Sequence, residues 1–342
     1  MSLRDAIERA MRREEVPAET LEAAFVEIAA GKASEIEITA LLVALRTKGE
    51  TQREIVAAAR ALRASGHSAP CLDPRTLDTC GTGGDGAGTF NVSTTAAFVV
   101  AGAGVPVAKH GNRAASSRAG SIDVLEALGV SVDLPVDASA RILAEVGIAP
   151  FFAARAHPAM RHVAAVRRTL GVRTVMNCMG PLLNPLGVRH QLVGVYARAL
   201  VEPLAGALAE LGARRALVVH GRDGLDEITT AEVTDAAFLE GGRVRTLAID
   251  PGALGIATPP AGALAGGDAP RNAEILRAVL DGEHGPRRDI ALLNAGAALW
   301  VADAAADLGH GMQVAARSVD SGAARRKLDA LVEASHRAVR AA

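Results

Sequence analysis

The sequence of 342 residues has few cysteines, no excess of charge of either sign and no long apolar run. Its three cysteines, Cys71, Cys80 and Cys178, form no C-x-x-C pair, which argues against a disulfide framework and a structural zinc site. With 37 basic and 38 acidic residues the formal net charge is -1, so no global field draws the chain towards nucleic acid or an anionic membrane. The N-terminus lacks an apolar signal region, and no run reaches the roughly 18 residues of a membrane span. We therefore expect a cytoplasmic protein that binds neither nucleic acid nor a membrane.

The chain is long enough for two domains, and its 49% hydrophobic content is ample for their cores. Residues 1–66 show the pattern of consecutive helices. Ser34 with Glu37 and Thr51 with Glu54 match the capping box, in which a cap residue and the third helical residue satisfy each other's backbone donors. This part of the chain is predicted to be entirely helical.

The pattern changes near residue 70 to short β-branched or apolar runs, RTLDTC, VPVAKH, ALVVHG and RVRTLAID, separated by glycine-rich loops and helical stretches. This alternation predicts an α/β fold with a mostly parallel sheet flanked by helices. A helical segment, HPAMRHVAAVRRTLG, interrupts it and is expected to rejoin the N-terminal helices. We expect a small all-helical domain of residues 1–69 with about 155–185, and a larger α/β domain of residues 70–154 with 186–342. Further helices are predicted at 272–281, 288–302 and 321–338.

A glycine-rich loop, DTCGTGGDGAGTFNVST at residues 78–94, leaves a strand and enters a helix near Asn91. Gly81, Gly83 and Gly86 match G-x-G-x-x-G, but no acid follows about 20 residues later, as a dinucleotide site requires, and no Walker A lysine is present. What remains is general anion binding by backbone N–H groups of a glycine loop and a helix N-terminus. The alternative is a tight structural turn capped by Asn91.

A polar segment, KHGNRAASSRAG at residues 109–120, follows the apolar run AAFVVAGAGVPVA. Loops that follow parallel strands leave the sheet at one edge, so this segment and the glycine-rich loop are expected to face one ligand. Its cationic, amide and hydroxyl side chains suit phosphate oxygens. The alternative is a solvated basic loop before a surface helix.

Charged residues stand out at two other places. Arg167 is the single charge on a helical face shared with Met160 and Ala164, and its guanidinium requires a carboxylate from either a ligand or the protein itself. Asp226 and Glu227 follow the predicted strand ALVVHG and are the hard ligands that magnesium accepts together with substrate phosphates. Paired acids in a loop are otherwise usually solvated.

The sequence resembles the anthranilate phosphoribosyltransferase family over nearly its whole length, in DTCGTGGDGAGTFNVST, VAKHGNRAASSRAGSIDVLEALG, HPAMRHVAAVRRTLGVRTVMNCMGPLLNP and HGRDGLDEIT. The resemblance implies transfer of the phosphoribosyl group of 5-phosphoribosyl 1-diphosphate to the amino group of anthranilate, with release of diphosphate, in tryptophan biosynthesis. It also implies a helical domain beside an α/β domain, a homodimer formed through the helical domain, and a pair of magnesium ions per active site.

The same resemblance assigns roles to individual residues. Phosphoribosyl diphosphate binding falls to Gly81, Gly84, Asp85, Thr89, Asn91, Val92, Ser93, Thr94, Lys109, His110, Gly111, Asn112, Arg113, Ala114, Ala115, Ser116, Ser117 and Ser121. Anthranilate binding falls to Gly81, Asn112 and Arg167, with His157 and Pro181 lining the entry channel. Magnesium binding falls to Ser93, Asp226 and Glu227. No covalent nucleophile or general acid–base residue is implied, so catalysis is expected to be electrostatic and positional.

Other functions are distinguishable in principle. A pyrimidine nucleoside phosphorylase shares the implied fold but lacks the HGNRAASS and Arg167 features. A nucleic-acid-binding relative is disfavoured by the net charge of -1. A dinucleotide dehydrogenase is disfavoured because the ribose-binding acid is missing.

Overall fold

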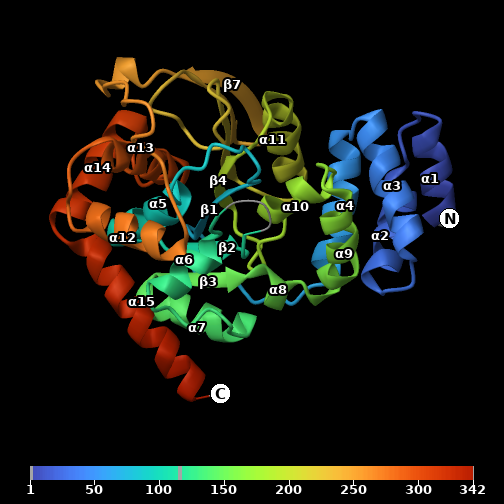
Figure 1. The fold of residues 1–342 in the computed structure, drawn as a ribbon, viewed down its shortest axis with the longest axis horizontal. Helices are drawn as coiled ribbons and strands as arrows, with labels where there is room; N and C mark the ends of the chain where they lie inside the picture. Colours follow the sequence, from blue (N-terminus) through green and yellow to red (C-terminus); the bar gives the residue numbers. More distant parts are fainter. Residues whose placement is uncertain (1–2, 115–117, 342) are drawn as a thin grey trace.

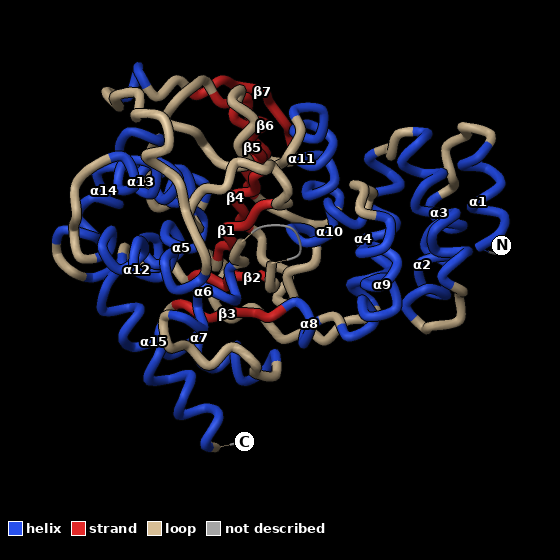
Figure 2. The backbone as a smooth tube through the Cα atoms, in the orientation of Figure 1, coloured by secondary structure: helices blue, strands red, loops and turns tan. Residues whose placement is uncertain are grey.

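The computed structural model describes residues 3–114 and 118–341, and a seven-stranded sheet runs through its centre (Figure 2). The strands are β1 (Leu77–Gly81), β2 (Val107–Gly111), β3 (Ile148–Phe152), β4 (His190–Gly194), β5 (Arg215–Gly221), β6 (Thr234–Glu240) and β7 (Arg243–Ile249). Their order is β3-β2-β1-β4-β5-β6-β7. The first five in the order are parallel, which confirms the mostly parallel sheet, whereas β6 and β7 pair antiparallel as a hairpin.

Four helices form the N-terminal part of the molecule, at the right of Figure 1: α1 (Leu3–Met11), α2 (Ala18–Ala29), α3 (Glu35–Lys48) and α4 (Gln52–Ala64). Both predicted capping boxes are confirmed, because the Ser34 and Thr51 side chains accept the backbone N–H of Glu37 and Glu54, whose carboxylates accept in return. The helical character of this segment follows from the sequence as predicted.

The segment between β3 and β4 is also helical and turns back towards the N-terminus. It contains α8 (Ala153–Ala156), a 3-10 turn at Pro158–Met160, α9 (Arg161–Leu170) and α10 (Met176–Leu182). Helix α9 packs against α2 and α3, and α10 packs against α4 (Figure 1). The His162 ring lies so close to Gly31 that a Cβ there would stand 2.7 Å from the ring. The segment that contains α9 therefore packs closely against the N-terminal helices, although the two are far apart in sequence.

The remaining helices cover the sheet: α5 (Val92–Gly102), α6 (Ser121–Ala127), α7 (Val136–Val146), α11 (Val201–Glu210), α12 (Ala269–Leu280), α13 (Pro286–Val301), α14 (Leu308–Asp320) and α15 (Ala323–Arg340). Helix α5 is buried over most of its length and packs against α13, α14 and α15 on one face. Helix α11 covers the other face of β5 and β6 and contacts α4. The predicted helices at 272–281, 288–302 and 321–338 correspond to α12, α13 and α15. No helix among the described residues is long and apolar enough to cross a membrane.

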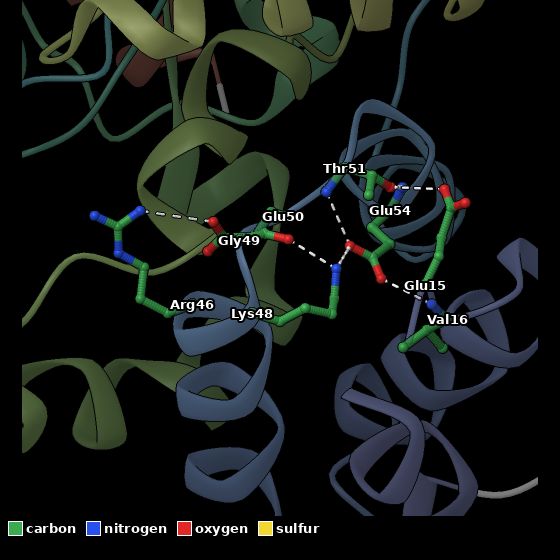
Figure 3. Close-up of polar contacts among 8 residues, drawn as sticks. All are labelled: Glu15, Val16, Arg46, Lys48, Gly49, Glu50, Thr51 and Glu54. Atoms are coloured by element: carbon green, nitrogen blue, oxygen red, sulfur yellow. Dashed lines mark hydrogen bonds and ion pairs between the residues drawn. The ribbon is translucent and has the colours of Figure 1, made fainter. Parts of the chain in front are cut away.

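Glu54 holds the N-terminal helices together through a buried carboxylate (Figure 3). Its Oε1 accepts from the backbone N of Val16 at 2.8 Å, and its Oε2 accepts from the Thr51 N at 2.9 Å and from the Lys48 Nζ at 2.8 Å. The Glu54 side chain is 0% exposed and that of Lys48 is 5% exposed. Because both charges are desolvated, each depends on the other.

We predict that Glu54→Gln lowers the free energy of unfolding by about 3 kcal/mol, because it leaves the buried Lys48 ammonium without its counter-charge. Chemical denaturation followed by far-UV circular dichroism measures this. Glu37→Gln is the matched control, since Glu37 occupies the same capping-box position in α3 but lies at the exposed surface. Equal losses in the two variants would contradict the role assigned to the buried pair.

Candidate functional site

The site lies at the carboxyl edge of the parallel strands, where β1, β2, β4 and β5 all end in glycine. The loop of residues 222–230 folds back over two of these ends. A Cβ on Gly194 would stand 1.6 Å from the carbonyl oxygen of Asp226, and a Cβ on Gly81 would stand 2.7 Å from its Oδ2. No larger residue fits at Gly194 without moving this backbone. Glycine at these strand ends therefore allows the acidic loop to lie on the sheet.

The first half of the glycine-rich loop contacts these acids directly. The backbone N of Gly83 donates to Oδ2 of Asp226 at 2.8 Å. Asp85 accepts from the N of Ala87 at 3.2 Å and, more weakly, from the N of Asp226 at 3.5 Å. Gly83 and Gly84 have φ of 66° and 82°, in the region that favours glycine. The loop is thus built so that its backbone N–H groups turn towards negative charge.

The start of α5 brings the second group of predicted residues to the same place. The backbone N of Ser93 donates to Oε1 of Glu227 at 3.0 Å. The Asn91 side chain does not cap the helix; it donates to the Ala119 carbonyl and accepts from Asn272 instead. The simple alternative of an Asn-capped structural turn is therefore not what this structure shows. Val92 is buried, and Thr94 is buried with no partner for its Oγ1 among the described residues.

Burial raises the pKa values of both acids, Asp226 and Glu227. Burial, reinforced by the nearby charge of Asp85, raises the pKa of Asp226 to about 7. Burial, reinforced by the charge of Asp226, raises the pKa of Glu227 to about 8, although Lys109 and the Ser93 N–H oppose the shift. A bound cation would oppose both shifts, because a nearby positive charge favours the ionised carboxylates.

Two buried groups of opposite charge, Lys109 and Asp78, lie on the neighbouring strands β2 and β1. Lys109 is 3% exposed, and its Nζ donates to the carbonyl of Thr79 at 2.6 Å. Asp78 is 0% exposed, and burial raises its pKa to about 6 against the opposing charge of Lys109. Asn184 donates to Asp78 at 2.9 Å. Lys109 thus contributes positive charge from below the site rather than as an exposed donor.

The donor set fits a magnesium ion held jointly with a ligand. Asp226, Glu227 and the Ser93 hydroxyl offer oxygen atoms, which this cation prefers. Among the described residues, no three or more His, Cys, Asp or Glu side chains lie close enough to hold a metal by themselves. Magnesium normally takes one or two protein carboxylates and completes its shell with water and substrate phosphates. The arrangement therefore suits a cation that arrives with a polyanion.

The polar segment after β2 is only partly described. Ala115, Ser116 and Ser117 lie outside the described residues. Asn112 accepts from the backbone N of Arg113, whose guanidinium pairs with Asp123 and Glu126. Ala114 donates to Asp123 at 2.8 Å. Ser121 begins α6, with its Oγ against Gly111, where a Cβ would be 2.1 Å away.

Two buried histidines sit beside Pro181. The His110 and His157 rings meet edge to face, 5.6 Å apart between centroids, and bond through one nitrogen each to the carbonyls of Gly180 and Leu183. The other ring nitrogen of each has no partner among the described residues. Burial lowers the pKa of His110 to about 3 and also lowers that of His157. Both rings are therefore neutral near pH 7.

Arg167 lies on α9, away from the acids. Burial lowers its pKa, and its guanidinium forms no hydrogen bond or ion pair with any residue in the described part of the chain. An internal salt bridge, the alternative for this residue, is therefore absent there. A half-buried guanidinium without a partner in the described part of the chain favours an anionic ligand.

Sequence reasoning missed several residues of the site. Asp78 is an acid within an otherwise apolar strand, and such a position predicts a buried carboxylate that is hydrogen-bonded to other residues. Arg173 donates to the carbonyl of Gly84 and stacks over the Tyr196 ring at 4.2 Å. Tyr196 is the single tyrosine of the chain, and its backbone N donates to the Thr82 hydroxyl at 3.0 Å. These contacts join residues that are distant in sequence, so no local sequence pattern predicts them.

We predict that Glu227→Gln stabilises the metal-free protein at pH 8 by about 1 to 3 kcal/mol. A carboxylate whose pKa is raised by folding binds its proton more tightly in the folded state. The wild type therefore loses stability as pH rises from the unfolded pKa, near 4.5, through the folded pKa, about 8. The gain from Gln shrinks towards pH 5, where Glu227 is already neutral.

Urea denaturation in EDTA at pH 5 and pH 8 measures the difference. Glu232→Gln is the matched control, because Glu232 is an exposed acid of the same loop region. A gain that is independent of pH, or equal in the control, would count against buried charge as its source.

The chain matches two family models. Residues 73–325 match "Glycosyl transferase family, a/b domain", and residues 4–66 match "Glycosyl transferase family, helical bundle domain". The two matches together cover most of the chain.

Known proteins of the same length resemble it throughout. The anthranilate phosphoribosyltransferase of Myxococcus xanthus is 51% identical over 337 residues, covering 97% of this chain and 99% of that protein. The crystal structure of the Thermus thermophilus enzyme matches with a TM-score of 0.91 at 42% identity, covering 97% and 99% of the two chains. The Saccharomyces cerevisiae enzyme, solved with PRPP and Mg and also with 4-fluoroanthranilate, matches at 26% identity with TM-scores of 0.89 and 0.88 and 98% of each chain covered. With its parallel-sheet site and its helical part both matched, the chain belongs to the anthranilate phosphoribosyltransferase family.

Proposed function

We propose that the protein transfers the phosphoribosyl group of 5-phosphoribosyl 1-diphosphate to the amino group of anthranilate, releasing diphosphate, as a step of L-tryptophan biosynthesis. One observation carries this proposal: the glycine-rich loop, the start of α5 and the Asp226–Glu227 pair converge at the carboxyl edge of β1 and β4. The ligands of the yeast relative, PRPP with Mg and 4-fluoroanthranilate, support the two substrates.

The phosphate end of the site acts through oriented donors. Backbone N–H groups at Gly83 and Ser93 now point at Asp226 and Glu227, and they become donors to diphosphate oxygens when the carboxylates turn to a cation. Asp226, Glu227 and Ser93 would hold magnesium, with a pair of ions per site, and the metal would supply positive charge to neutralise the diphosphate. Lys109 adds positive charge from beneath.

The chemistry requires stabilisation of charge rather than a nucleophilic side chain. Cleavage of the bond from C1 to diphosphate leaves positive character on the ribosyl ring and negative charge on the leaving group. Fixed N–H donors stabilise the second of these without reorganising during the step. Asp85, in the glycine-rich loop, would meet the substrate through a metal ion, a water molecule or a ribose hydroxyl, because its carboxylate repels the phosphates directly.

The acceptor end is proposed to use Arg167, whose guanidinium binds the carboxylate of anthranilate. Its lack of a partner in the described part of the chain supports this role. Asn112 and the backbone of Gly81 would lie near the same substrate, and the neutral His157 ring and Pro181 would line its entry. An uncharged imidazole ring suits the aromatic ring of this substrate, because it does not compete with Arg167 for the substrate carboxylate.

Three wider features are part of the same proposal. The helical domain consists of residues 1–69 with about 155–185, and the α/β domain of the rest. The protein is a homodimer formed through the helical domain, in which Met11 is 71% exposed and Ile36 is 81% exposed. It resides in the cytoplasm, where its unpaired cysteines remain reduced.

The test is direct. Mixing the enzyme with magnesium, phosphoribosyl diphosphate and anthranilate should cause an enzyme-dependent loss of anthranilate fluorescence. The double variant Asp226→Asn, Glu227→Gln should lose most of this activity at millimolar magnesium, because its metal ligands are neutralised. No loss of fluorescence with the wild-type enzyme would refute the proposed function, and full activity of the double variant would refute the metal assignment.

We predict that Arg167→Ala raises the KM for anthranilate by about ten- to a hundredfold, the effect of removing a charge-assisted bidentate pair. Steady-state kinetics with each substrate varied in turn measure this. The KM for phosphoribosyl diphosphate should stay near that of the wild type. Arg168→Ala is the matched control, since Arg168 is exposed on the same helix. An effect confined to phosphoribosyl diphosphate would reverse the assignment.

A further inference from the structure

The second half of the glycine-rich loop is held by a chain segment that no motif assigned. Residues 264–272, here called the bracket, pair with Gly88–Phe90 in the manner of a short antiparallel ladder. Thr89 and Ala265 form an isolated bridge. Around it, the N of Phe90 donates to the Leu264 carbonyl at 3.1 Å, and the N of Gly266 donates to the Gly88 carbonyl at 2.9 Å. The backbone of the loop is therefore fixed on both sides of Thr89.

A side-chain relay leads from the bracket into the site through Asn272, which is 2% exposed. The backbone N of Gly267 donates to Oδ1 of Asn272 at 2.7 Å, and Nδ2 of Asn272 donates to Oδ1 of Asn91 at 2.9 Å. The Nδ2 of Asn91 in turn donates to the Ala119 carbonyl at 3.3 Å. The relay thus crosses from α12 to the entrance of α6.

The direction of this relay is fixed at both ends. A backbone N–H at Gly267 can only donate, so Oδ1 of Asn272 must face it and its NH2 group must face Asn91. A carbonyl at Ala119 can only accept, so Asn91 must turn its NH2 group the other way. Asn91 consequently keeps its oxygen on Asn272 and turns its NH2 group towards Ala119, in the segment that precedes α6.

Packing reinforces the same connection. A small apolar cluster, separate from the two larger cores, contains Phe90 and Val92 of the loop region, Leu225 beside Asp226, and Ile275 and Ile290 of α12 and α13. Leu264 of the bracket packs on it. The bracket therefore braces both the start of α5 and the acidic loop.

We propose that Asn272 is a positioning residue for phosphoribosyl diphosphate, which sets the amide orientation of Asn91 and thereby the donors that meet the substrate's oxygens. This inference rests on the proposed function, in which Asn91 binds that substrate. Asn272 itself touches no reacting atom. Its effect on binding comes through Asn91.

Two substitutions test the relay. Asn272→Leu keeps the approximate volume and removes the relay, and we expect it to raise the KM and Kd for phosphoribosyl diphosphate about tenfold, the effect of losing one well-oriented hydrogen bond. Asn272→Asp keeps an acceptor for Gly267 but faces Asn91 with oxygen, and it should weaken binding at least as much. The KM for anthranilate at saturating phosphoribosyl diphosphate should not change.

A third variant perturbs the bracket without replacing Asn272. A Cβ on Gly266 would stand 2.7 Å from both the N of Phe90 and Oδ1 of Asn272, so Gly266→Ala disturbs the loop contact and the relay together and should also weaken phosphoribosyl diphosphate binding. Ser335→Ala is the control: Ser335 is 0% exposed and accepts from the Ser131 N at 3.0 Å, far from the loop in sequence. It should lose stability without losing affinity.

Calorimetric titration with phosphoribosyl diphosphate and magnesium, thermal unfolding and steady-state kinetics separate the outcomes. The inference is overturned if Asn272→Leu and Gly266→Ala bind phosphoribosyl diphosphate as tightly as an active wild type does. It is also overturned if the KM values for both substrates rise equally, and if Ser335→Ala shows the same rises at a comparable loss of stability. A wild type that neither binds nor consumes phosphoribosyl diphosphate would instead overturn the proposed function.

Discussion

The backbone of the acidic loop lies directly on the carboxyl ends of β1 and β4, and the rest of the site depends on this approach. The Asp226 carbonyl occupies the space that a side chain at Gly194 would take. From there Asp226 and Glu227 reach the N–H groups of Gly83 and Ser93. Acids, anion-binding donors and a helix N-terminus are thereby gathered at one point of the sheet.

Bringing the two acids together has an electrostatic cost, because both carboxylates are removed from water. Two partly or fully buried carboxylates with raised pKa values repel each other, and the charge of the buried Lys109 ammonium offsets part of the shift at Glu227. A cation bound with its polyanionic substrate completes the neutralisation. The site is thus destabilised when empty and satisfied when loaded, a common relation between stability and function.

Local features of the sequence predicted much of this structure. The capping boxes at Ser34 and Thr51 were predictable because the interacting groups lie three residues apart. The mostly parallel sheet followed from the alternation of elements, but the reversed direction of β6 did not, because a strand's own residues do not determine its partner. The glycine-rich loop and the Asp226–Glu227 pair were visible as motifs.

The residues that sequence reasoning missed act over long distances along the chain. Asp78 meets Asn184, Arg173 meets Gly84, and Asn272 meets Asn91, and only the folded chain brings these pairs together. Lys109 illustrates the same limit, since its residue type suggested an exposed phosphate donor, whereas strand register places its ammonium beneath the loop. The chemical type of the site residues was predictable from the sequence, but the direction in which each side chain points was not.

The central claim is that Asp226 and Glu227 bind a cation together with the diphosphate held by the glycine-rich loop. Calorimetric titration of the wild-type protein with phosphoribosyl diphosphate across a series of magnesium concentrations tests it most directly. The account predicts that affinity for phosphoribosyl diphosphate rises steeply with magnesium and that this rise is lost when both acids are replaced by amides. Binding that is equally tight without magnesium, or a magnesium dependence that survives the replacement, would contradict it.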